Sequence, residues 1–535
     1  MVRWDSVGCI QQGFANVSIQ INEPYRCIAL HLGFLESIEA FIGGMEIPTG
    51  THARDAPRET RRAERDATRR ERRDTPRAPS VKTALDPQCV VWGRSGAWEK
   101  GRMHMNLLAG ADRLPKALLA LEDGTALEGS CCGAQGEAFG EMVFNTSMTG
   151  YQEIVSDPSY AGQIVTFTYP QIGNYGVNAH DMQAASLALR GVVVHDMCFT
   201  PSNWQSAGSL PDFLRERGVV AMQGVDTRAL TLRIREGGAM RAALSTEDLD
   251  PQSLVARVRE SESISARNLV ADVSTKERYE VVGEGGPLAG GGASSADGGR
   301  PHVHVVALDF GEKRGIVERL AAAGCDVTVV PWDTPAADVL ALGPDGVFFS
   351  NGPGDPKSVP EAAETARELL GRIPIFGICL GNQLLTLAAG GQVEKLPYGH
   401  HGGNEPVMNL LTTKVEITAQ NHNYGPVFSS LGPLVPELSG GVSDHARDLR
   451  LWSSRHIAPV VRSKRFGRIR LTHVNLNDGT PEGLQFLDVP AFSMQYHPEA
   501  KPGPNDSSYA FDAFCRLMGG CKDYLAIDVR ERRAH

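Results

Sequence analysis

The segment that begins at residue 302 alternates short apolar runs with stretches of helical periodicity, and this alternation constrains the fold more than any other feature. Strands that are apolar on both faces and are separated by helices predict a parallel sheet covered on both sides, a doubly wound α/β domain. In such sheets, ligands bind at the carboxyl ends of the strands. The expected strands are 303–308, 326–330, 346–350 and 373–378, and the expected helices are 313–323, 336–342, 360–370 and 383–389.

A second domain is expected before this one, at residues 115–278. It holds short β-rich runs, and the apolar run 117–121 is followed by the turn residues 122–125, which is typical of a hairpin. A helical stretch is expected near 210–217. The fold class is therefore α/β, with an N-terminal β-rich α/β domain ahead of the doubly wound domain.

The other segments differ in composition from both domains. Residues 279–301 are mostly Gly, Ala and Ser, which predicts a flexible linker to the doubly wound domain at 302–520. Residues 54–77 are dense in both Arg and acidic side chains and offer no apolar face. We therefore expect residues 1–114 to be a poorly structured extension, and 521–535 to be a tail.

Composition excludes several classes of protein. The 535 residues include 53 basic and 63 acidic side chains, a net charge of -10 that does not favour nucleic acid. No stretch reaches the roughly 18 uninterrupted apolar residues of a membrane-spanning helix, so we expect neither nucleic acid nor a membrane as a partner. The 10 cysteines form no CxxC pair, and His400 and His401 are adjacent without nearby thiols, so we expect no bound metal.

One cysteine stands where a buried strand is expected to end and a helix to begin. Gly377 and Gly381 flank Cys379 and permit a tight turn there. The positive end of the helix dipole favours a thiolate at that position. An arbitrary cysteine is usually a buried apolar side chain, but the flanking glycines favour a nucleophile.

A nucleophile of this kind needs a base and a group that orients the base. His497 and Glu499 follow the apolar run 492–496, and Pro498 prevents the strand from continuing. We predict that His497 takes the thiol proton and that Glu499 holds the imidazole tautomer, which gives a Cys-His-carboxylate triad.

A third strand end carries the Gly/Pro turn 350–356. Glycine lets the backbone approach a ligand closely, so the amides of Gly352 and Leu380 are predicted to form an oxyanion hole for a tetrahedral intermediate. Taken alone, this segment would be interpreted as an ordinary strand-to-helix turn.

The motifs around these residues resemble those of a known family. The segment 377–383 together with 497–499 is similar to the class I glutamine amidotransferases. Further segments resemble the small subunit of glutamine-dependent carbamoyl phosphate synthetase, and these are 141–154, 157–160, 350–356 and 399–404.

The resemblance implies hydrolysis of L-glutamine to glutamate and ammonia through a thioester on Cys379. Ammonia would pass to a large subunit, which makes carbamoyl phosphate for arginine and pyrimidine synthesis. ATP and Mg are expected on that large subunit, and no cofactor is expected on this chain, which has no P-loop sequence. The positions that match the glutamine-binding residues of the family are Ser159, Gly352, Gly354, Leu380, Gln383, Asn421, Asn423 and Tyr424.

The chain departs from the family pattern in two places. Asn382 stands where relatives often have His, outside the triad, and we expect little effect. Residues 425–470 form an insert without a clear apolar period, and structureless loops of that length are uncommon in compact domains. The insert is a surface excursion, a contact for the large subunit or a translated intron, and its composition favours the intron. It puts the contacts of Asn423 and Tyr424 in question more than the triad.

Two other functions stay open at this point. One is a catalytically impaired scaffold subunit, which the intact triad disfavours. The other is the glutaminase of another synthetase, which the segment 150–153 disfavours. We expect a cytoplasmic location, with the plastid or the mitochondrial matrix as alternatives, because residues 1–114 are Arg-rich like a transit peptide but are also rich in acids.

Overall fold

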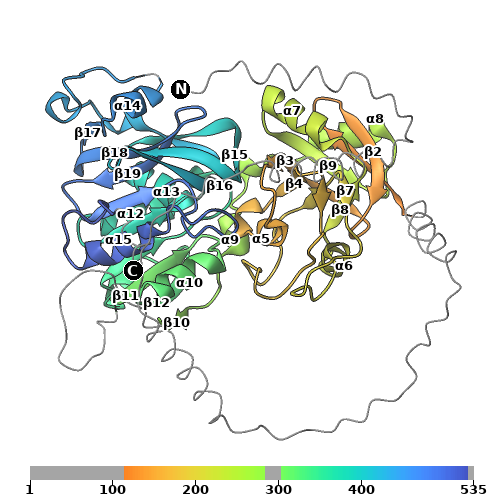
Figure 1. Ribbon diagram of the computed structural model, residues 1–535, viewed down its shortest axis with the longest axis horizontal. Helices are drawn as coiled ribbons and strands as arrows, with labels where there is room; N and C mark the ends of the chain where they lie inside the picture. The colour runs from red at the N-terminus through yellow and green to blue at the C-terminus, as the bar shows by residue number, and fades with distance from the viewer. Residues whose placement is uncertain (1–113, 284–302, 447, 528–535) are drawn as a thin grey trace, which may run out of the picture. The chain divides into compact units, whose positions relative to one another are not determined.

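The computed structural model describes residues 114–283, 303–446 and 448–527 (Figure 1). They fold into two domains within one compact unit of the chain. The predicted extension, most of the predicted linker and the end of the predicted tail lie outside the described residues.

The N-terminal domain is built on a closed barrel. Its strands are β1 Lys116–Leu121, β2 Ala126–Cys131, β3 Glu137–Asn145, β4 Gln163–Phe167, β6 Gly191–Val193, β8 Val220–Gln223 and β9 Met240–Ser245. The order around the barrel is β1-β2-β8-β6-β4-β3-β9. β1 and β2 form the antiparallel hairpin that the sequence predicts, with Leu119 opposite Leu127. A separate parallel pair is formed by β5 Gln171–Ile172 and β7 Asp196–Met197.

Short helices cover this barrel. They are α5 Tyr151–Val155, α6 Leu210–Glu216, α7 Thr227–Gly237, α8 Pro251–Glu260 and α9 Val270–Val273, with the 3-10 turns η3 Pro158–Tyr160 and η4 Ile264–Ala266. The predicted helix near 210–217 is α6, which Ser209 caps by accepting a hydrogen bond from the Asp212 amide. Leu210 and Leu214 of α6 pack on Val192 of the barrel.

The C-terminal domain contains an 11-stranded sheet whose central strands are parallel (Figure 1). These central strands are β12 Cys325–Pro331, β11 Val303–Asp309, β13 Gly346–Phe349, β14 Ile375–Ile378 and β20 Ala491–Met494, in that order across the sheet. The helices are α10 Arg314–Ala322, α11 Ala336–Ala341, α12 Pro360–Leu369, α13 Leu380–Ala388 and α15 Tyr509–Met518.

Both faces of this sheet are covered, as the sequence predicts. Val306 and Leu308 of β11 share a core cluster with α11, α12 and α13. Val305 and Ala307, which point to the opposite face, share a core cluster with α10 and α15. This alternation follows from the period of two in a strand and confirms the doubly wound domain.

An antiparallel extension of the sheet was not predicted. Next to β20 lie β19 Pro481–Phe486, β18 Gly467–Asn475, β15 Gln392–Asn409 and β16 Lys414–Val427. β15 and β16 form one long hairpin with bulges between Lys395 and His400 and between Gly402 and Glu405. Bulges are common beside active sites, where they redirect side chains.

Residues 425–470, which the sequence marks as an atypical insert with the composition of a translated intron, are folded. The segment contains the end of β16, the 3-10 turns η6 Phe428–Leu431 and η7 Pro436–Leu438, the helix α14 Arg450–Arg455 and the strand β17 Val460–Ser463, which pairs with β18. Trp452 and Val461 are buried in the core cluster shared with α12 and α13. The apolar residues of this segment show no period because short turns separate them, yet they reach the same core.

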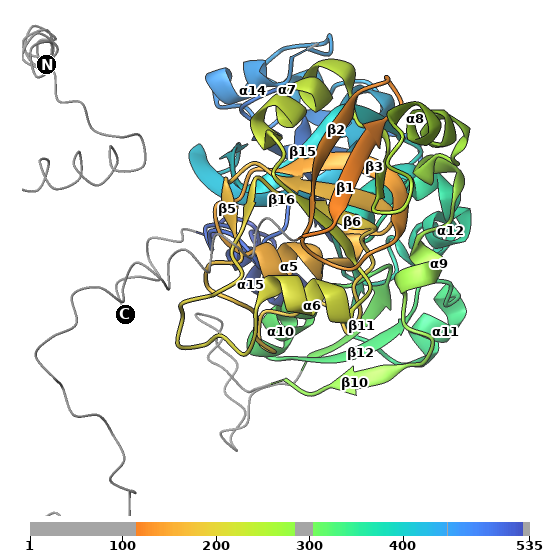
Figure 2. The same ribbon diagram turned by 90° about the vertical axis from the view of Figure 1, so that its right-hand side faces the viewer.

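Two predicted boundaries are also wrong. Residues 279–281 are not linker but form β10, Tyr279–Val281, an edge strand antiparallel to β12 that Figure 2 shows beside it. Residues 521–527 are not a free tail, because Tyr524, Leu525 and Ile527 are buried in the core with Phe492. Both segments are too short to give a periodic signal in the sequence.

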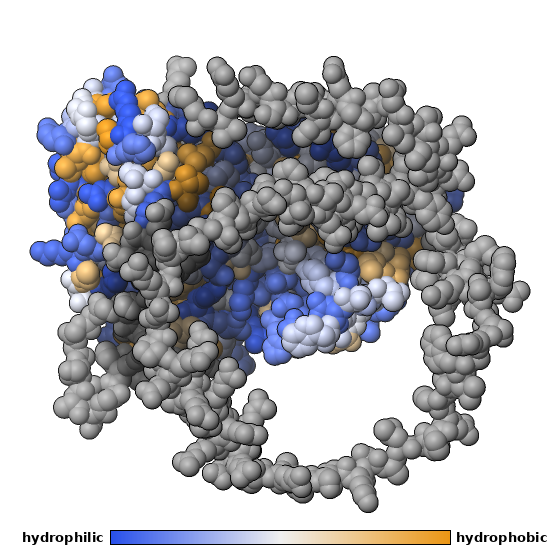
Figure 3. Space-filling model, in the orientation of Figure 1, coloured by the Kyte–Doolittle hydropathy of each residue, from blue (hydrophilic) through white to orange (hydrophobic). Residues whose placement is uncertain are grey.

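The described surface is mixed in polarity. Hydrophilic and hydrophobic residues are interspersed over the coloured part of the face in Figure 3. Within the described parts of the chain, no helix combines the length and apolar character needed to cross a bilayer.

Candidate active site

Cys379 lies in the sharp turn between β14 and α13, with φ 53° and ψ -103°. A non-glycine residue in this conformation is strained, and such strain is concentrated at functional sites. The turn also requires the neighbouring glycines. A methyl group on Gly381 would lie 2.2 Å from the carbonyl oxygen of Phe349, and one on Gly377 would lie 2.8 Å from the carbonyl carbon of Gly381. This strand–turn–helix geometry is the one that the sequence predicts for a nucleophile elbow, and the role of Cys379 stays a prediction.

His497 and Glu499 follow β20, the strand paired with β14. His497 Nδ1 lies 2.8 Å from Glu499 Oε1, as the predicted triad requires. Lys313 also donates to this oxygen, with its Nζ 2.7 Å away. The other ring nitrogen of His497, Nε2, has no hydrogen-bond partner within the described structure, so it is available to the thiol of Cys379.

The charges of this group support one another. Burial lowers the pKa of His497, but the negative charge of Glu499 and interactions with Cys379 and Glu499 raise it to about 10 overall. Burial raises the pKa of Glu499, yet the charges of Lys313 and His497 hold this pKa well below its ordinary value. Glu499 is therefore ionised, and it stabilises the imidazolium that forms when His497 accepts a proton.

A small cavity brings the predicted glutamine contacts together beside the nucleophile. Its volume is about 20 Å³, room for roughly one water molecule. The predicted residues that line it are Ser159, Gly352, Gly354, Cys379, Gln383, Asn421, Asn423 and Tyr424. Leu380 does not line the cavity.

The N-terminal domain supplies part of this cavity and contacts its other side. Ser159 of η3 accepts a hydrogen bond from Asn351 Nδ2 at 2.8 Å. The hydroxyl oxygens of Tyr424 and Ser265 lie 2.8 Å apart. Gln383 Nε2 donates to the backbone carbonyl of Tyr424 at 2.8 Å. The predicted contacts thus lie between the two domains, and Asn423 and Tyr424 remain in place beside the folded segment 425–470.

A buried histidine that the sequence did not single out orders two of these residues. His401 Nδ1 lies 2.9 Å from Asn421 Oδ1, and His401 Nε2 lies 2.8 Å from Asn423 Oδ1. Burial lowers the pKa of His401 to about 4, so the neutral ring donates to one of the two amides. Asn421 Nδ2 donates to Asp157 Oδ2 at 2.8 Å, which joins η3 to the strand β16.

The predicted oxyanion hole is sterically consistent with the structure. Leu380 is the first residue of α13, and the first amides of a helix have no acceptor within it. Gly352 packs closely on this turn, since a methyl group there would lie 2.3 Å from the Phe310 carbonyl oxygen and 2.8 Å from Leu380 Cδ2. The assignment of these two amides stays a prediction.

Lys313, His401 and Asp157 are the site residues that sequence reasoning missed. Lys313 follows β11, whose carboxyl end lies at the same edge of the sheet as Cys379, so the rule that locates ligands at strand ends was a usable signal. His401 and Asp157 lie in the segments 399–404 and 157–160 that carry the family resemblance, but no role was assigned to them because their partners are distant in sequence.

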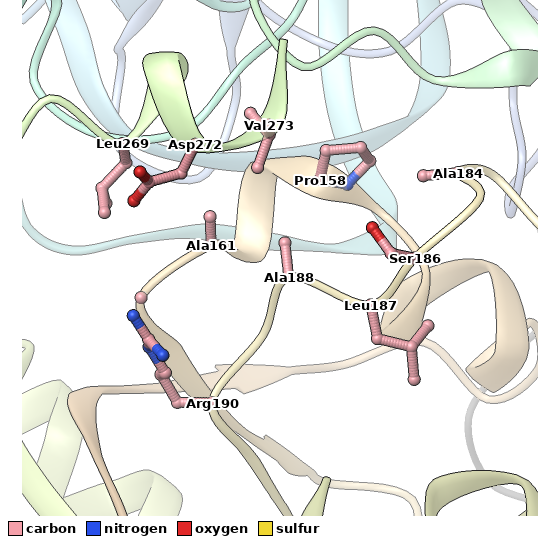
Figure 4. Close-up of a pocket in the computed structure, with 11 residues that line it drawn as sticks. Pro158, Ala161, Ala184, Ser186, Leu187, Ala188, Arg190, Leu269, Asp272 and Val273 are labelled. Carbon is pink, nitrogen blue, oxygen red and sulfur yellow. The ribbon is translucent and has the colours of Figure 1, made fainter. Parts of the chain in front are cut away.

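A larger cavity lies behind η3, away from the nucleophile. It has a volume of about 320 Å³ and lies between η3, α9 and the chain at 184–190 (Figure 4). Most of the residues that line it are aliphatic, and Arg190 and Asp272 are the charged ones among them. It does not include Cys379, so the smaller cavity is the candidate substrate pocket.

The fold, with Cys379, His497 and Glu499 at the edge of its sheet, is that of a class I glutamine amidotransferase domain joined to a second domain. Residues 306–431 and 453–517 match the family model described as glutamine amidotransferase class-I. Residues 119–244 match the model described as carbamoyl-phosphate synthase small chain, CPSase domain. Residues 432–452 lie between the two matched segments and are not matched by the amidotransferase model. This unmatched segment is shorter than the insert predicted at 425–470.

Full-length relatives make the assignment specific. The carbamoyl phosphate synthase small chain of Syntrophotalea carbinolica is 49% identical over 75% of this chain and 98% of its own length. That of Thermotoga maritima is 47% identical over 75% of this chain and 98% of its own length. The chloroplastic small chain of Arabidopsis thaliana is 44% identical over 75% of this chain and 85% of its own length. The chain belongs to the carbamoyl phosphate synthase small-chain family.

Proposed function

We propose that this chain is the glutamine-hydrolysing subunit of carbamoyl phosphate synthase and that Cys379 is its nucleophile. The observation that carries the proposal is the strained position of Cys379 at the start of α13. His497, which interacts with Cys379, is already held at Nδ1 by Glu499. Membership of the small-chain family supplies the substrate, L-glutamine, and the reaction class.

The mechanism follows from this geometry. The Cys379 thiolate attacks the carboxamide carbon of glutamine, and the carbonyl oxygen takes the negative charge that the amides of Gly352 and Leu380 stabilise. His497, which carries the thiol proton, transfers it to the departing nitrogen, so ammonia leaves and a thioester forms. Water then attacks the thioester with His497 as base, which releases glutamate and restores the thiol. Glu499 holds the imidazole of His497 in one orientation throughout, and Lys313 holds Glu499.

Ammonia produced here is a reactant for a second chain. We place ATP and Mg on a large subunit that uses this ammonia to make carbamoyl phosphate, and the relatives' names as small chains support such a partner. The pyrimidine-specific name of the Bacillus subtilis relative supports a role in pyrimidine synthesis, and a role in arginine synthesis is part of the proposal.

The narrow cavity suggests how the subunit is controlled. At about 20 Å³ it does not admit glutamine, and residues of both domains close it. Docking of the large subunit is therefore proposed to shift the domains and open the site, as conformational steps do in coupled enzymes. The isolated chain should hydrolyse glutamine more slowly than the complex.

The test is glutamate release from glutamine by the full chain, with and without a carbamoyl phosphate synthase large subunit. Cys379→Ser should abolish release, and Cys521→Ser, which changes an exposed cysteine, should leave it intact. Release that survives Cys379→Ser would overturn the assignment. Equal rates for the isolated chain and the complex would overturn the control by docking.

The alternatives from the sequence are less favoured. A scaffold subunit without activity does not explain the assembled triad, and a glutaminase for another synthetase does not explain the match of residues 119–244 to the CPSase domain.

For location we propose the cytoplasm, and the chloroplastic name of the Arabidopsis relative supports the plastid as the alternative.

A further inference from the structure

Two histidines and a glutamate form a buried cluster on the antiparallel part of the sheet, outside the triad. His400 of β15 and His422 of β16 are direct cross-strand partners, and their ring centroids lie 4.9 Å apart. Glu482 of β19 completes the cluster. One side-chain N or O atom from each of the three lies within 4.8 Å of the others. The sequence did not reveal this group, because three separate strands supply it.

Two atoms of the cluster lack hydrogen-bond partners within the described structure. They are His400 Nδ1 and Glu482 Oε2. The side chain of Glu482 is fully buried, with 0% exposure. Buried polar atoms are rarely left unpaired, because desolvation without a partner is unfavourable. A cation at the centre of the cluster would satisfy both atoms.

The outer nitrogens of both rings are already held in place. His400 Nε2 lies 2.8 Å from Asp478 Oδ2, and His422 Nδ1 lies 2.9 Å from the backbone carbonyl oxygen of Tyr424. Metal-binding histidines commonly hold a carboxylate or a carbonyl with the ring nitrogen that does not bind the metal. This arrangement leaves His400 Nδ1 and His422 Nε2 as the nitrogens that would bind the metal. His422 Nε2 now contacts Gln420 Oε1 at 2.7 Å, a bond that metal binding would replace.

We propose that His400, His422 and Glu482 bind a transition-metal dication, with Zn²⁺ as the best fit. Two imidazole nitrogens and one carboxylate are typical zinc ligands, whereas Mg²⁺ and Ca²⁺ prefer oxygen. Zinc bonds of about 2.0–2.1 Å in tetrahedral geometry place ligand atoms roughly 3.4 Å apart. His400 Nδ1 lies 3.5 Å from Glu482 Oε1, which is close to that spacing. Oε1 also accepts a hydrogen bond from Asn475 Nδ2 at 3.2 Å, so Oε2 is the carboxylate oxygen that is free for the cation.

A cavity lies beside the partner of His400, although none of the three proposed ligands lines it. Asp478, the partner of His400, lines a cavity of about 200 Å³. Water or the Gln420 amide oxygen would complete the tetrahedron.

The competing occupant of the cluster is a proton. Burial lowers the pKa of His400, but hydrogen bonds and charge interactions with Asp478 and Glu482 raise it to about 10 overall. A protonated His400 between two carboxylates would also explain the unpaired atoms in part. A metal ion must displace this proton before it binds His400. Titration with metal therefore shows whether the cluster binds a metal ion or keeps the proton.

The experiment titrates the full chain, stripped of metal with a chelator, with Co²⁺ and then Zn²⁺. The expected result is one equivalent of Co²⁺ with the visible absorption of a tetrahedral site, displaced by Zn²⁺, and a melting temperature that rises with free metal. Glu482→Gln should remove this binding. Asp478→Asn should weaken it by about 10–100-fold, as expected for a residue that orients a ligand. His180→Asn, at an exposed histidine, should not change it.

The proposal fails if the unmodified chain shows no tetrahedral cobalt spectrum, or if the spectrum persists in both Glu482→Gln and Asp478→Asn. Circular dichroism checks that each variant is folded. If Glu482→Gln does not fold, Asp478→Asn decides, because that side chain is half-exposed and is outside the ligand set. Unchanged metal affinity in Asp478→Asn would then reject the site.

Discussion

Lys313 donates to Glu499 Oε1 at 2.7 Å, and the two side chains are 3% and 0% exposed. Both charges have lost their water, so each depends on the few partners that it keeps inside the protein. His497 shares the same oxygen. Lys313 therefore neutralises part of the charge that orients His497, although it is distant from His497 and Glu499 in sequence.

Replacing Lys313 with Met should destabilise the protein by about 3–5 kcal/mol, because the Glu499 charge stays buried with one partner fewer. Chemical denaturation measures this change. The pKa of Glu499 is lowered in the fold, so its contribution to stability is present above the unfolded value of about 4.3 and is lost as the pH falls. In Lys313→Met this pKa rises, and acid unfolding should begin at a higher pH.

The half-exposed pair Lys501 and Glu318 provides the control. Lys501→Met should cost less than about 1 kcal/mol, as is usual for such pairs. Equal destabilisation by Lys313→Met and Lys501→Met would show that the buried pair has no special role.

Glu499→Gln should lower kcat by about 10²–10⁴-fold with a smaller change in KM, because the base loses its orienting charge.

The same variant should change the stability of the protein at alkaline pH. The pKa of His497 is raised to about 10, so its contribution is fully present below about 6.5 and is lost as the pH rises through about 10. Unfolding measured from pH 6 to 10 should show this loss in the unmodified protein and less of it in Glu499→Gln. Identical profiles for the two proteins would contradict the charge pairing.

Gly381→Ala should disrupt the elbow, because the added methyl group would lie 2.2 Å from the Phe349 carbonyl oxygen. Overpacking of this kind costs about 1–3 kcal/mol or more, and the displaced thiol should lose most of its glutaminase activity. Gly208→Ala is the matched control, since a methyl group there meets only Val177 Cγ2 at 3.8 Å. An active, fully stable Gly381→Ala protein would mean that the turn tolerates a side chain and that its strain is incidental.

The sequence predicted the parallel part of the sheet and the position of Cys379 at its edge for the same reason. Val305 to Leu308 are apolar at every position, which is typical of a strand buried on both faces, and the chemistry lies at the ends of such strands. Local signals were enough there, because Gly377, Cys379 and Gly381 are close together in the chain.

The parts that the sequence did not predict depend on distant contacts. His401 is recognisable only beside Asn421 and Asn423 of the neighbouring strand. The antiparallel hairpin formed by β15 and β16 mixes buried polar residues with apolar ones, so no simple period marks it. Polar side chains in this hairpin are buried because they bond one another across the strands, and single-sequence patterns do not contain that information.

The segment 432–452, which the family model does not match, provides the last prediction. Trp452 is 1% exposed and packs in the core with Val461 and Phe428. Trp452→Ala should therefore destabilise the protein by about 3–5 kcal/mol, as loss of a large buried side chain does. Leu438→Ala in the same segment, at a side chain with 40% exposure, should change stability by less than about 0.5 kcal/mol. Thermal or urea unfolding of the full chain measures both. A segment that entered the chain as a translated intron without a structural role would give neutral results for both variants, so a neutral Trp452→Ala would revive that interpretation.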